Sequence, residues 1–399
     1  MSEPQGRHPW PFPMPHIWRQ IPGLVWNDHR SASQKVRRFG IFIGLTLGGA
    51  LGRVCLLLDK LFDRECDRVE IREPVFIVGN ARSGTTLLHR LLTGDEERFV
   101  TFKGWELFCP SLLQKRAVRF AVEALRYVSP KLLERMAEWE ARQMPDLKRL
   151  NPLGINETQE DELLLIQYFA TPGLAVAFPY MQELNELEYF DDLPSEHQDA
   201  VLSLYRECVT RQLAFHDERR EGLTFLSKNP AFVGKLRALL EQFPDARFIY
   251  PRRDPLESLP SILAMLREAW KLTNFDEREM ELASQAVIDG CIKDYFYATE
   301  VLEELPADRF AVVEFEAFTA DPARTVRGIY RHFGWTLDED YGRWLTEAAP
   351  KPDSSIPTRR RRLEDFGFDE DVIAARIASA ASNAGAPTQP NQEPDPTTR

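Results

Sequence analysis

Residues 74–92, PVFIVGNARSGTTLLHRLL, join a short apolar run to a glycine-rich loop and then to a leucine-rich segment. The all-apolar run at 74–78 predicts a strand buried inside a parallel sheet. The leucines at 87, 88, 91 and 92 share one face of a predicted helix, which Gly94 ends. A loop that opens a helix in this way presents backbone N–H groups to an anion. The stretch therefore predicts an α/β fold with an anion site after its first strand.

The loop has the glycine spacing of a nucleotide-hydrolysing phosphate loop but lacks its lysine. Gly79 and Gly84 are separated by four residues, and two hydroxyl residues follow. A triphosphate-binding loop places a lysine directly after the second glycine, where it reaches the β- and γ-phosphates. Thr85 occupies that position here, and the nearest cation is Arg82. The loop therefore indicates a phosphate-bearing ligand that does not need this lysine.

Apolar runs at 223–226, 247–250 and 310–313 predict three more strands, each followed by a helical pattern. Strands that alternate with helices predict a parallel sheet with helices on both faces. Residues 105–220 read as helices and loops inserted between the strand at 74–78 and the strand at 223–226. We expect this insertion to form a lid and an acceptor pocket.

The predicted strand ends bring further cations to one edge of the sheet. Lys228 follows the second strand and Arg253 the third, and Ser261 lies eight residues after Arg253. In an open parallel sheet, ligands bind beyond the carboxyl ends of the strands. Two separated cationic sites on that edge suit a nucleotide with phosphates at two places, rather than one triphosphate.

These motifs resemble those of the sulfotransferases that use 3′-phosphoadenosine 5′-phosphosulfate (PAPS), in their bacterial and tyrosylprotein-like branch. Arg82-Ser83-Gly84-Thr85-Thr86 is similar to their 5′-phosphosulfate loop, and Arg253 with Ser261 to their 3′-phosphate site. Lys228-Asn229-Pro230 resembles their Lys-Asp-Pro element, and residues 310–335 resemble their closing strand and helix. The resemblance covers residues 74–100 and 223–336, in family order.

The resemblance implies that a sulfuryl group moves from PAPS to a hydroxyl or amine acceptor, leaving adenosine 3′,5′-bisphosphate. It implies that Arg82 and Lys228 are catalytic and that no metal takes part. It further implies a glutamate general base after the first helix, for which Glu106 is the candidate. The acidic run at 157–162 offers rival bases or forms a polar helix face. The implied PAPS-binding residues are Arg82, Ser83, Gly84, Thr85, Thr86, Arg253 and Ser261.

Residues 39–58, FGIFIGLTLGGALGRVCLLL, form an apolar segment in which Arg53 is the single charge. The segment has about the length of a membrane span. Its glycines at 40, 44 and 48 have the spacing found between close-packed membrane helices. Three placements are open: a helix packed on the domain, a helix lying on a membrane surface, or a span.

The expected organisation is a proline- and tryptophan-rich arm at 1–38 and an apolar helical segment at 39–68. A sulfotransferase-like domain at 69–377 and a disordered tail at 378–399 follow. A net charge of −12 argues against a nucleic-acid partner. Five scattered cysteines are typical of a reducing compartment. We therefore expect a cytoplasmic protein, associated with a membrane if residues 39–58 lie on one.

Two other functions are compatible with the chain. A nucleotide kinase or another phosphate-loop NTPase would bind ATP with magnesium, and the missing lysine argues against it. A catalytically inactive, membrane-associated scaffold would keep the nucleotide fold without turnover, and the set of Arg82, Lys228 and Arg253 disfavours it. The acceptor is left open: a carbohydrate, a lipid head group, a small alcohol or phenol, or a peptide would fit.

Overall fold

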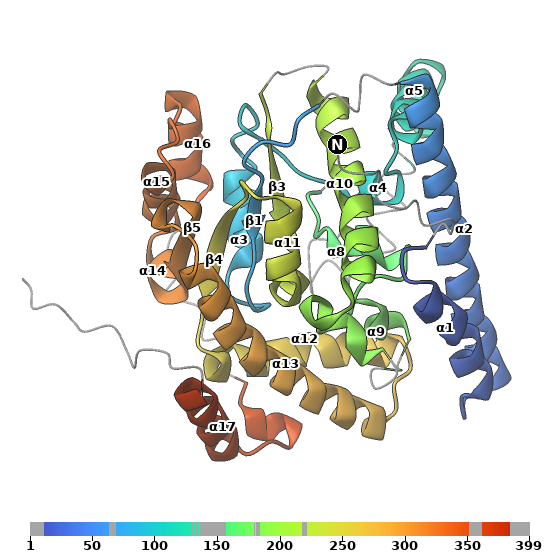
Figure 1. Cartoon of the computed structure of the whole chain (residues 1–399), viewed down its shortest axis with the longest axis vertical. Coiled ribbons are helices and arrows are strands. Elements are labelled where there is room, and N and C mark those ends of the chain that lie inside the picture. The colour runs from blue at the N-terminus through green and yellow to red at the C-terminus, as the bar shows by residue number, and fades with distance from the viewer. Residues whose placement is uncertain are drawn as a thin grey trace, which may run out of the picture.

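The computed structural model describes residues 12–63, 69–129, 157–178, 184–217, 222–350 and 361–383, together with 131, 132, 135 and 180. Within these residues, five strands form one all-parallel sheet in the order β2-β3-β1-β4-β5 (Figure 1). The sheet confirms the predicted α/β class. The strands are β1 (Val75–Ile77), β2 (Phe99–Val100), β3 (Thr224–Lys228), β4 (Arg247–Arg252) and β5 (Phe310–Glu314).

β1 lies at the centre of the sheet and sends side chains to both faces. Phe76 packs against Phe248 in one core, whereas Ile77 joins Leu88 in the other. Successive strand residues point to opposite faces, so an all-apolar strand is stable only where both faces are covered. The helices α3 (Thr85–Leu92) and α15 (Pro322–His332) contribute to one core, and α10 (Ser195–Asp217) and α11 (Leu236–Gln242) to the other.

The register of the central strands aligns the turns that follow them. Ile77 lies opposite Lys228 on one side and Ile249 on the other. The turns after β1, β3 and β4 therefore share one edge of the sheet, where ligands of open parallel sheets bind. After β3, the Asn229 side chain accepts a 3.0 Å hydrogen bond from Ala231 N and caps the 3₁₀ turn η4 (Pro230–Lys235), which leads into α11.

β2 is a strand that the sequence pattern does not predict. It is two residues long, too short to show a period, and it pairs with β3 through Phe99 and Thr224. The predicted insertion therefore lies between β2 and β3, not directly after the helix that follows β1. Its described elements are α4 (Gly104–Phe108), α5 (Leu112–Val128), α8 (Glu162–Ile166), α9 (Leu174–Ala177), η2 (Asn185–Leu187), η3 (Phe190–Asp192) and α10.

Two helices, α1 (Pro15–Asn27) and α2 (Ala32–Phe62), form the N-terminal part of the described chain. Figure 1 shows α2 running along one side of the domain, with α1 packed beside it. α2 begins at Ala32, before the expected start at 39, because Ser31 and Gln34 form a capping box. Residues 1–11 and 64–68 of the predicted arm and helical segment lie outside the described residues.

After β4, two long helices follow, α12 (Pro255–Leu272) and α13 (Glu277–Glu303). The predicted disorder from 378 is wrong for residues 378–383, which belong to α17 (Glu370–Asn383). Ile373 and Ile377 pack this helix against α12 and α13, and its alanines favour helix. Residues 384–399 lie outside the described residues. The remaining elements are η5 (Ala307–Arg309), α14 (Phe315–Ala320), α16 (Glu339–Ala348) and η6 (Leu363–Phe366).

Candidate functional site

The loop between β1 and α3 is a tight turn held against the end of β4. Arg82 and Gly84 both have a left-handed backbone, with φ of 65° and 83°. A positive φ is uncommon for a residue with a side chain, and such strain concentrates at functional sites. A Cβ atom on Gly79 would lie 3.0 Å from the Pro251 carbonyl oxygen. Glycine at this position therefore lets the loop approach the end of β4.

Arg82 joins the two cationic turns predicted from the sequence. Its Nε donates to Ser261 Oγ at 2.9 Å, and its carbonyl oxygen accepts from Arg253 Nη1, also at 2.9 Å. The Arg253 guanidinium carbon lies 4.0 Å from the centre of the Phe315 ring, a cation–π contact. Pro260 does not displace Ser261, since α12 continues through both residues. Arg82, Arg253 and Ser261 thus form one contiguous polar cluster.

The two neighbouring arginines after β4 have different partners. Arg252 pairs with Glu314 at the end of β5, with Nε 3.0 Å from a carboxylate oxygen. Arg253 turns toward the phosphate loop, where its guanidinium contacts Arg82. Arg253, and not Arg252, is therefore the arginine that faces the predicted anion site.

Lys228 reaches the start of α3 from the end of β3. Its Nζ donates to Thr86 Oγ1 at 3.2 Å and forms an ion pair with Glu160. Thr86 and Arg82 are exposed, whereas Thr85 and Ser83 are buried. In the part of the chain that the structure describes, Ser83 Oγ has no hydrogen-bond partner. A buried hydroxyl without a partner is costly unless a ligand satisfies it.

Glu160, which the sequence pattern does not single out within its acidic run, is the carboxylate that contacts Lys228. It belongs to the acidic run at 157–162, whose members have separate surroundings in the fold. Asp161 is buried and accepts a hydrogen bond from Tyr205, and Glu162 accepts one from Asn229 at 3.0 Å. The pairing of Lys103 with Thr158 across two loops helps to bring Glu160 to Lys228. No local periodicity predicts that pairing.

Glu106 lies in a separate buried network. One carboxylate oxygen accepts from Lys103 N at 2.7 Å and from Gln212 at 2.8 Å, and the other lies 3.1 Å from His216 Nε2. Burial raises the pKa of Glu106, but the hydrogen bond with His216 and the charge of Lys115 outweigh it and hold the pKa below its ordinary value. The residue is 1% exposed. The described contacts bring Glu106 to neither Lys228 nor Arg82.

Lys115 supports this second network from α5. Its Nζ donates to Gln212 Oε1 at 2.5 Å, and Gln212 in turn donates to Glu106. Burial lowers the pKa of Lys115 to about 8, although the charge of Glu106 acts in the opposite direction. Lys115 and Glu106 are thus opposite charges buried near each other, and removing either one would leave the other buried without compensation.

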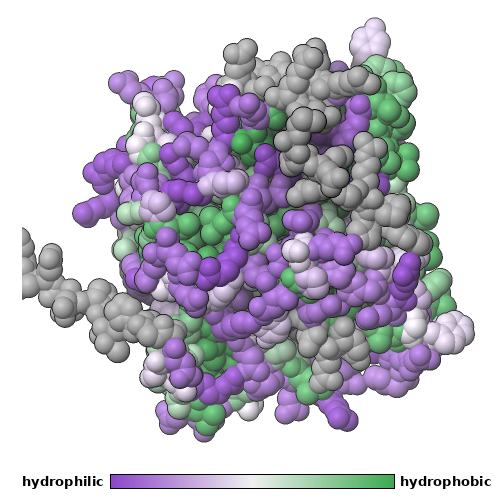
Figure 2. Space-filling view, viewed as in Figure 1, coloured by the Kyte–Doolittle hydropathy of each residue, from purple (hydrophilic) through white to green (hydrophobic). Residues whose placement is uncertain are grey.

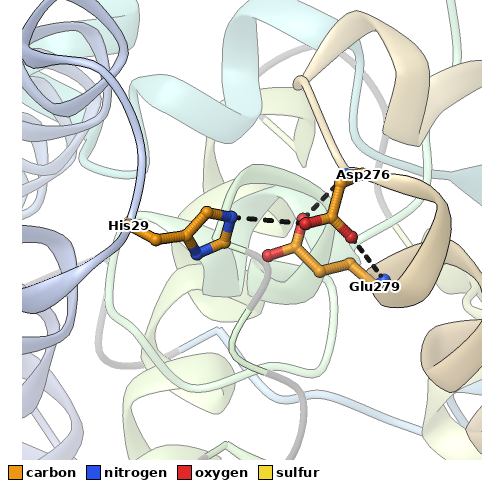
Figure 3. Close-up of side chains that lie close together, drawn as sticks. All are labelled: His29, Asp276 and Glu279. Atoms are coloured by element: carbon orange, nitrogen blue, oxygen red, sulfur yellow. Dashed lines mark hydrogen bonds and ion pairs between the residues drawn. The ribbon is translucent and has the colours of Figure 1, made fainter.

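Within the described residues, a further group of titratable side chains consists of His29, Asp276 and Glu279 (Figure 3). Glu279 pairs with Arg30, and Asp276 caps the first turn of α13 while lying 3.3 Å from His29 Nε2. These contacts join the turn between α1 and α2 to α13. The group is therefore explained as a structural connection between two helical segments.

The chain is similar to known sulfotransferases in sequence and in fold. The sequence profile of the sulfotransferase family matches residues 74–339. Two relatives, the omega-hydroxy-beta-dihydromenaquinone-9 sulfotransferases Stf3 of Mycobacterium bovis and Mycobacterium tuberculosis, are 28% identical over 275 residues. The match spans 68% of this chain and 65% of each relative.

Two solved structures share the fold. Sulfotransferase STF9 from Mycobacterium avium superposes with a TM-score of 0.71 and 19% identity, over 92% of this chain and 91% of the other. Sulfotransferase STF1 from Mycobacterium tuberculosis gives 0.66 and 19%, over 91% and 92%. At this identity the likeness concerns the fold alone.

Proposed function

This chain belongs to the sulfotransferase family, and we propose that it transfers a sulfuryl group from PAPS to the hydroxyl (or amine) group of an acceptor. Adenosine 3′,5′-bisphosphate is the second product. One observation carries the proposal: Arg82 connects the turn after β1 with Arg253 of the turn after β4 and with Ser261 of α12. A single nucleotide with two phosphate-bearing ends fits a continuous cationic edge of this kind.

The residues present suit that donor. The loop at 79–84 and the start of α3 supply backbone N–H groups and the hydroxyls of Thr85 and Thr86 to an anion. The unpartnered Ser83 Oγ adds a donor whose burial is otherwise unexplained. Arg253 with Ser261 offers a second cationic position for a 3′-phosphate.

PAPS, when bound, supplies an activated sulfuryl group: the acceptor oxygen bonds to sulfur as the bond from sulfur to the 5′-phosphate oxygen breaks. The chain's own contribution is to position the reactants and to stabilise charge on the departing phosphate. Lys228 is suited to that second task, since Thr86 and Glu160 hold its ammonium beside the phosphate loop. A preorganised cation in such a role lowers the barrier by about 2–4 kcal/mol.

The acceptor proton needs a base, and two carboxylates are candidates. Glu106 is the residue that the family resemblance implies, and its lowered pKa keeps it ionised. We favour Glu160, because its side chain is 29% exposed and contacts Lys228. Glu106 is 1% exposed, and its carboxylate already has three hydrogen-bond partners. A phosphate that competes for Lys228 would release the Glu160 carboxylate for the acceptor.

We further propose that the acceptor is an alcohol on a hydrophobic molecule. The Stf3 relatives carry the name of a hydroxylated dihydromenaquinone, which is a lipid alcohol. The insertion between β2 and β3, where Glu160 lies, is the region that would select it.

Donor binding is tested by calorimetry with adenosine 3′,5′-bisphosphate. Arg82→Ala and Arg253→Ala are each expected to weaken binding at least about tenfold, as the loss of a charge-assisted contact does. Arg252→Ala is the matched control: it removes a neighbouring arginine that pairs with Glu314, and binding should persist. Equal losses in the two arginine variants at 252 and 253 would contradict the assignment.

Transfer itself is tested with donor labelled in the sulfuryl group and a panel of lipid and small alcohols, with and without a chelator. Labelled product that forms equally with chelator present is the expected outcome. Magnesium-dependent ATP hydrolysis would instead support the kinase reading. Bisphosphate binding without transfer to any alcohol of the panel would support the inactive scaffold.

A further inference from the structure

The outward face of α2 is a continuous apolar stripe. Leu47 is 65% exposed and Leu51 57%, and their neighbours along the stripe are comparably open. The exposed apolar residues of α2 are Val36, Phe39, Ile43, Leu47, Leu51, Val54, Leu57, Leu61 and Phe62. They recur at helical spacing, and the stretch from Val36 to Leu61 spans roughly 38 Å at about 1.5 Å per residue. Figure 2 shows hydrophobic side chains along this edge of the molecule, over α2.

The opposite face of α2 is packed tightly on the domain. A Cβ atom on Gly49 would lie 2.3 Å from the Gln167 carbonyl oxygen, and one on Gly52 would lie 2.6 Å from the Tyr168 hydroxyl. Gly40 and Gly44 have nothing within 4 Å of such an atom. The spacing of the glycines at 40, 44 and 48 therefore does not mark the packed face: the close approach to the domain is made by Gly49 and Gly52.

Polar contacts connect α2 to the domain from one end to the other. Near its start, Arg38 donates to the Thr273 carbonyl at 2.7 Å. Near its end, the buried Asp59 accepts from the backbone N–H groups of Leu112 and Leu113 at 2.8 and 3.0 Å and so caps α5. A helix that left the domain to span a bilayer would expose these groups to hydrocarbon, at a cost of several kcal/mol per unsatisfied group. Among the described helices, α2 is long and apolar enough to cross a membrane. Its buried polar contacts with the domain argue against a transmembrane placement.

The charge beside the stripe differs in sign from that of the chain. α2 and α5, which pack together, carry nine lysine and arginine residues and two acidic ones, in a protein of net charge −12. Asp59, Arg38 and Lys115 are buried, which leaves seven basic residues and one acidic residue, Glu123, at least partly exposed on these two helices. Glu207 and Asp63 pair with Arg53, Lys60 and Arg116, and basic residues still remain in excess. An apolar face flanked by basic residues is typical of helices that lie in the interface of an anionic membrane.

We propose that α2 docks the folded enzyme on the surface of an anionic phospholipid bilayer, with its outward stripe in the interface and its inward face on the domain. This goes beyond the proposed function, because the docking depends on no residue of the donor site. It would also bring the enzyme to acceptors dissolved in the bilayer.

The test is sedimentation of the full chain with vesicles made of equal parts phosphatidylglycerol and phosphatidylcholine. The wild-type chain should bind, and added salt or vesicles of phosphatidylcholine alone should weaken binding. The double variant Leu47→Glu/Leu51→Glu should lower the bound fraction at least about tenfold, because it places two carboxylates in the interface. Val312→Glu/Val372→Glu, a matched change at exposed positions of β5 and α17, should leave binding unchanged.

Circular dichroism and bisphosphate binding should be the same in both double variants and in the wild type, so that a change in vesicle binding is not a folding defect. Loss of binding in both double variants would overturn the proposal, as would a wild-type chain that ignores vesicles. The proposal would also be overturned if the apolar stripe of α2 were an interface between two copies of the chain. In that case, analytical ultracentrifugation would find a dimer that Leu47→Glu/Leu51→Glu converts to a monomer.

Discussion

At the level of single residues, the proposed site has Lys228 at its centre. Its ammonium contacts Thr86 from the start of α3 and Glu160 from the insertion. Three segments far apart in the chain thus supply one cation, one hydroxyl and one carboxylate within hydrogen-bond reach. Glu106 contacts Gln212 and His216 in a different network. Substituting glutamine for Glu160 and for Glu106 is therefore expected to have different effects.

Glu160→Gln is expected to lower kcat by about 10²–10⁴-fold, the usual contribution of a general base, while bisphosphate affinity changes little. Glu106→Gln replaces an ionised side chain that is buried near Lys115, so it should lower the free energy of unfolding. Single-turnover rates, bisphosphate titration and denaturant unfolding of both variants separate these effects. If the Glu106 variant is stable but inactive while the Glu160 variant turns over normally, Glu106 is the base.

At the level of elements, α2 combines two faces of opposite character in one helix. The inward face relies on glycines, which allow the helix backbone to approach Gln167 and Tyr168. The outward face contains Gly40 and Gly44, and a Cβ atom on either would have nothing within 4 Å. The same residue type therefore has a packing function at 49 and 52 and only a conformational cost at 40 and 44.

Gly49→Ala is expected to destabilise the protein by about 1–3 kcal/mol, the range of overpacking in a tight contact. Gly44→Ala on the same helix should instead stabilise it by about 0.5–1 kcal/mol, because alanine favours helix and the position is open. Chemical denaturation of the two single variants measures both values. Effects of equal sign would mean that α2 does not hold this position against the domain.

At the level of the whole molecule, stability should depend on a carboxyl group buried between the sheet and α10. Burial raises the pKa of Asp161 from 3.8 to about 7, although the hydrogen bond from Tyr205 lowers it. An acid whose pKa is raised on folding binds its proton more tightly in the folded state. Its stabilising effect is therefore complete below about pH 4 and is lost as the pH rises through about 7.

Asp161→Asn removes this titration while keeping the shape of the side chain. Relative to the variant, the wild type should lose on the order of 4 kcal/mol of unfolding free energy between about pH 4 and pH 7. Denaturant unfolding across that interval, compared between the two proteins, gives the difference directly. Parallel curves for wild type and variant would show that Asp161 does not titrate in this interval.

The edge of the sheet where the turns after β1, β3 and β4 lie could largely be predicted from the sequence, because it depends on elements that are neighbours in the chain. A strand, a turn and a helix follow each other within twenty or so residues, and parallel strands bring their carboxyl ends to one edge. Arg82, Lys228 and Arg253 each lie directly at such a turn, so their convergence follows from the topology. The topology does not tell which of Arg252 and Arg253 turns toward Arg82, because this depends on the pairing of Arg252 with Glu314 of a neighbouring strand.

The sequence by itself determined the class of fold, the phosphate loop without its lysine, and the cationic turns that face the same edge. Only the tertiary structure decided which carboxylate lies beside Lys228 and which face of α2 remains open. The physical reason is sequence distance: Glu160 meets Lys228 and Gly49 meets Gln167 through contacts between segments far apart in the chain. Local spacing determines the conformation of a segment, whereas packing against distant segments determines its partners.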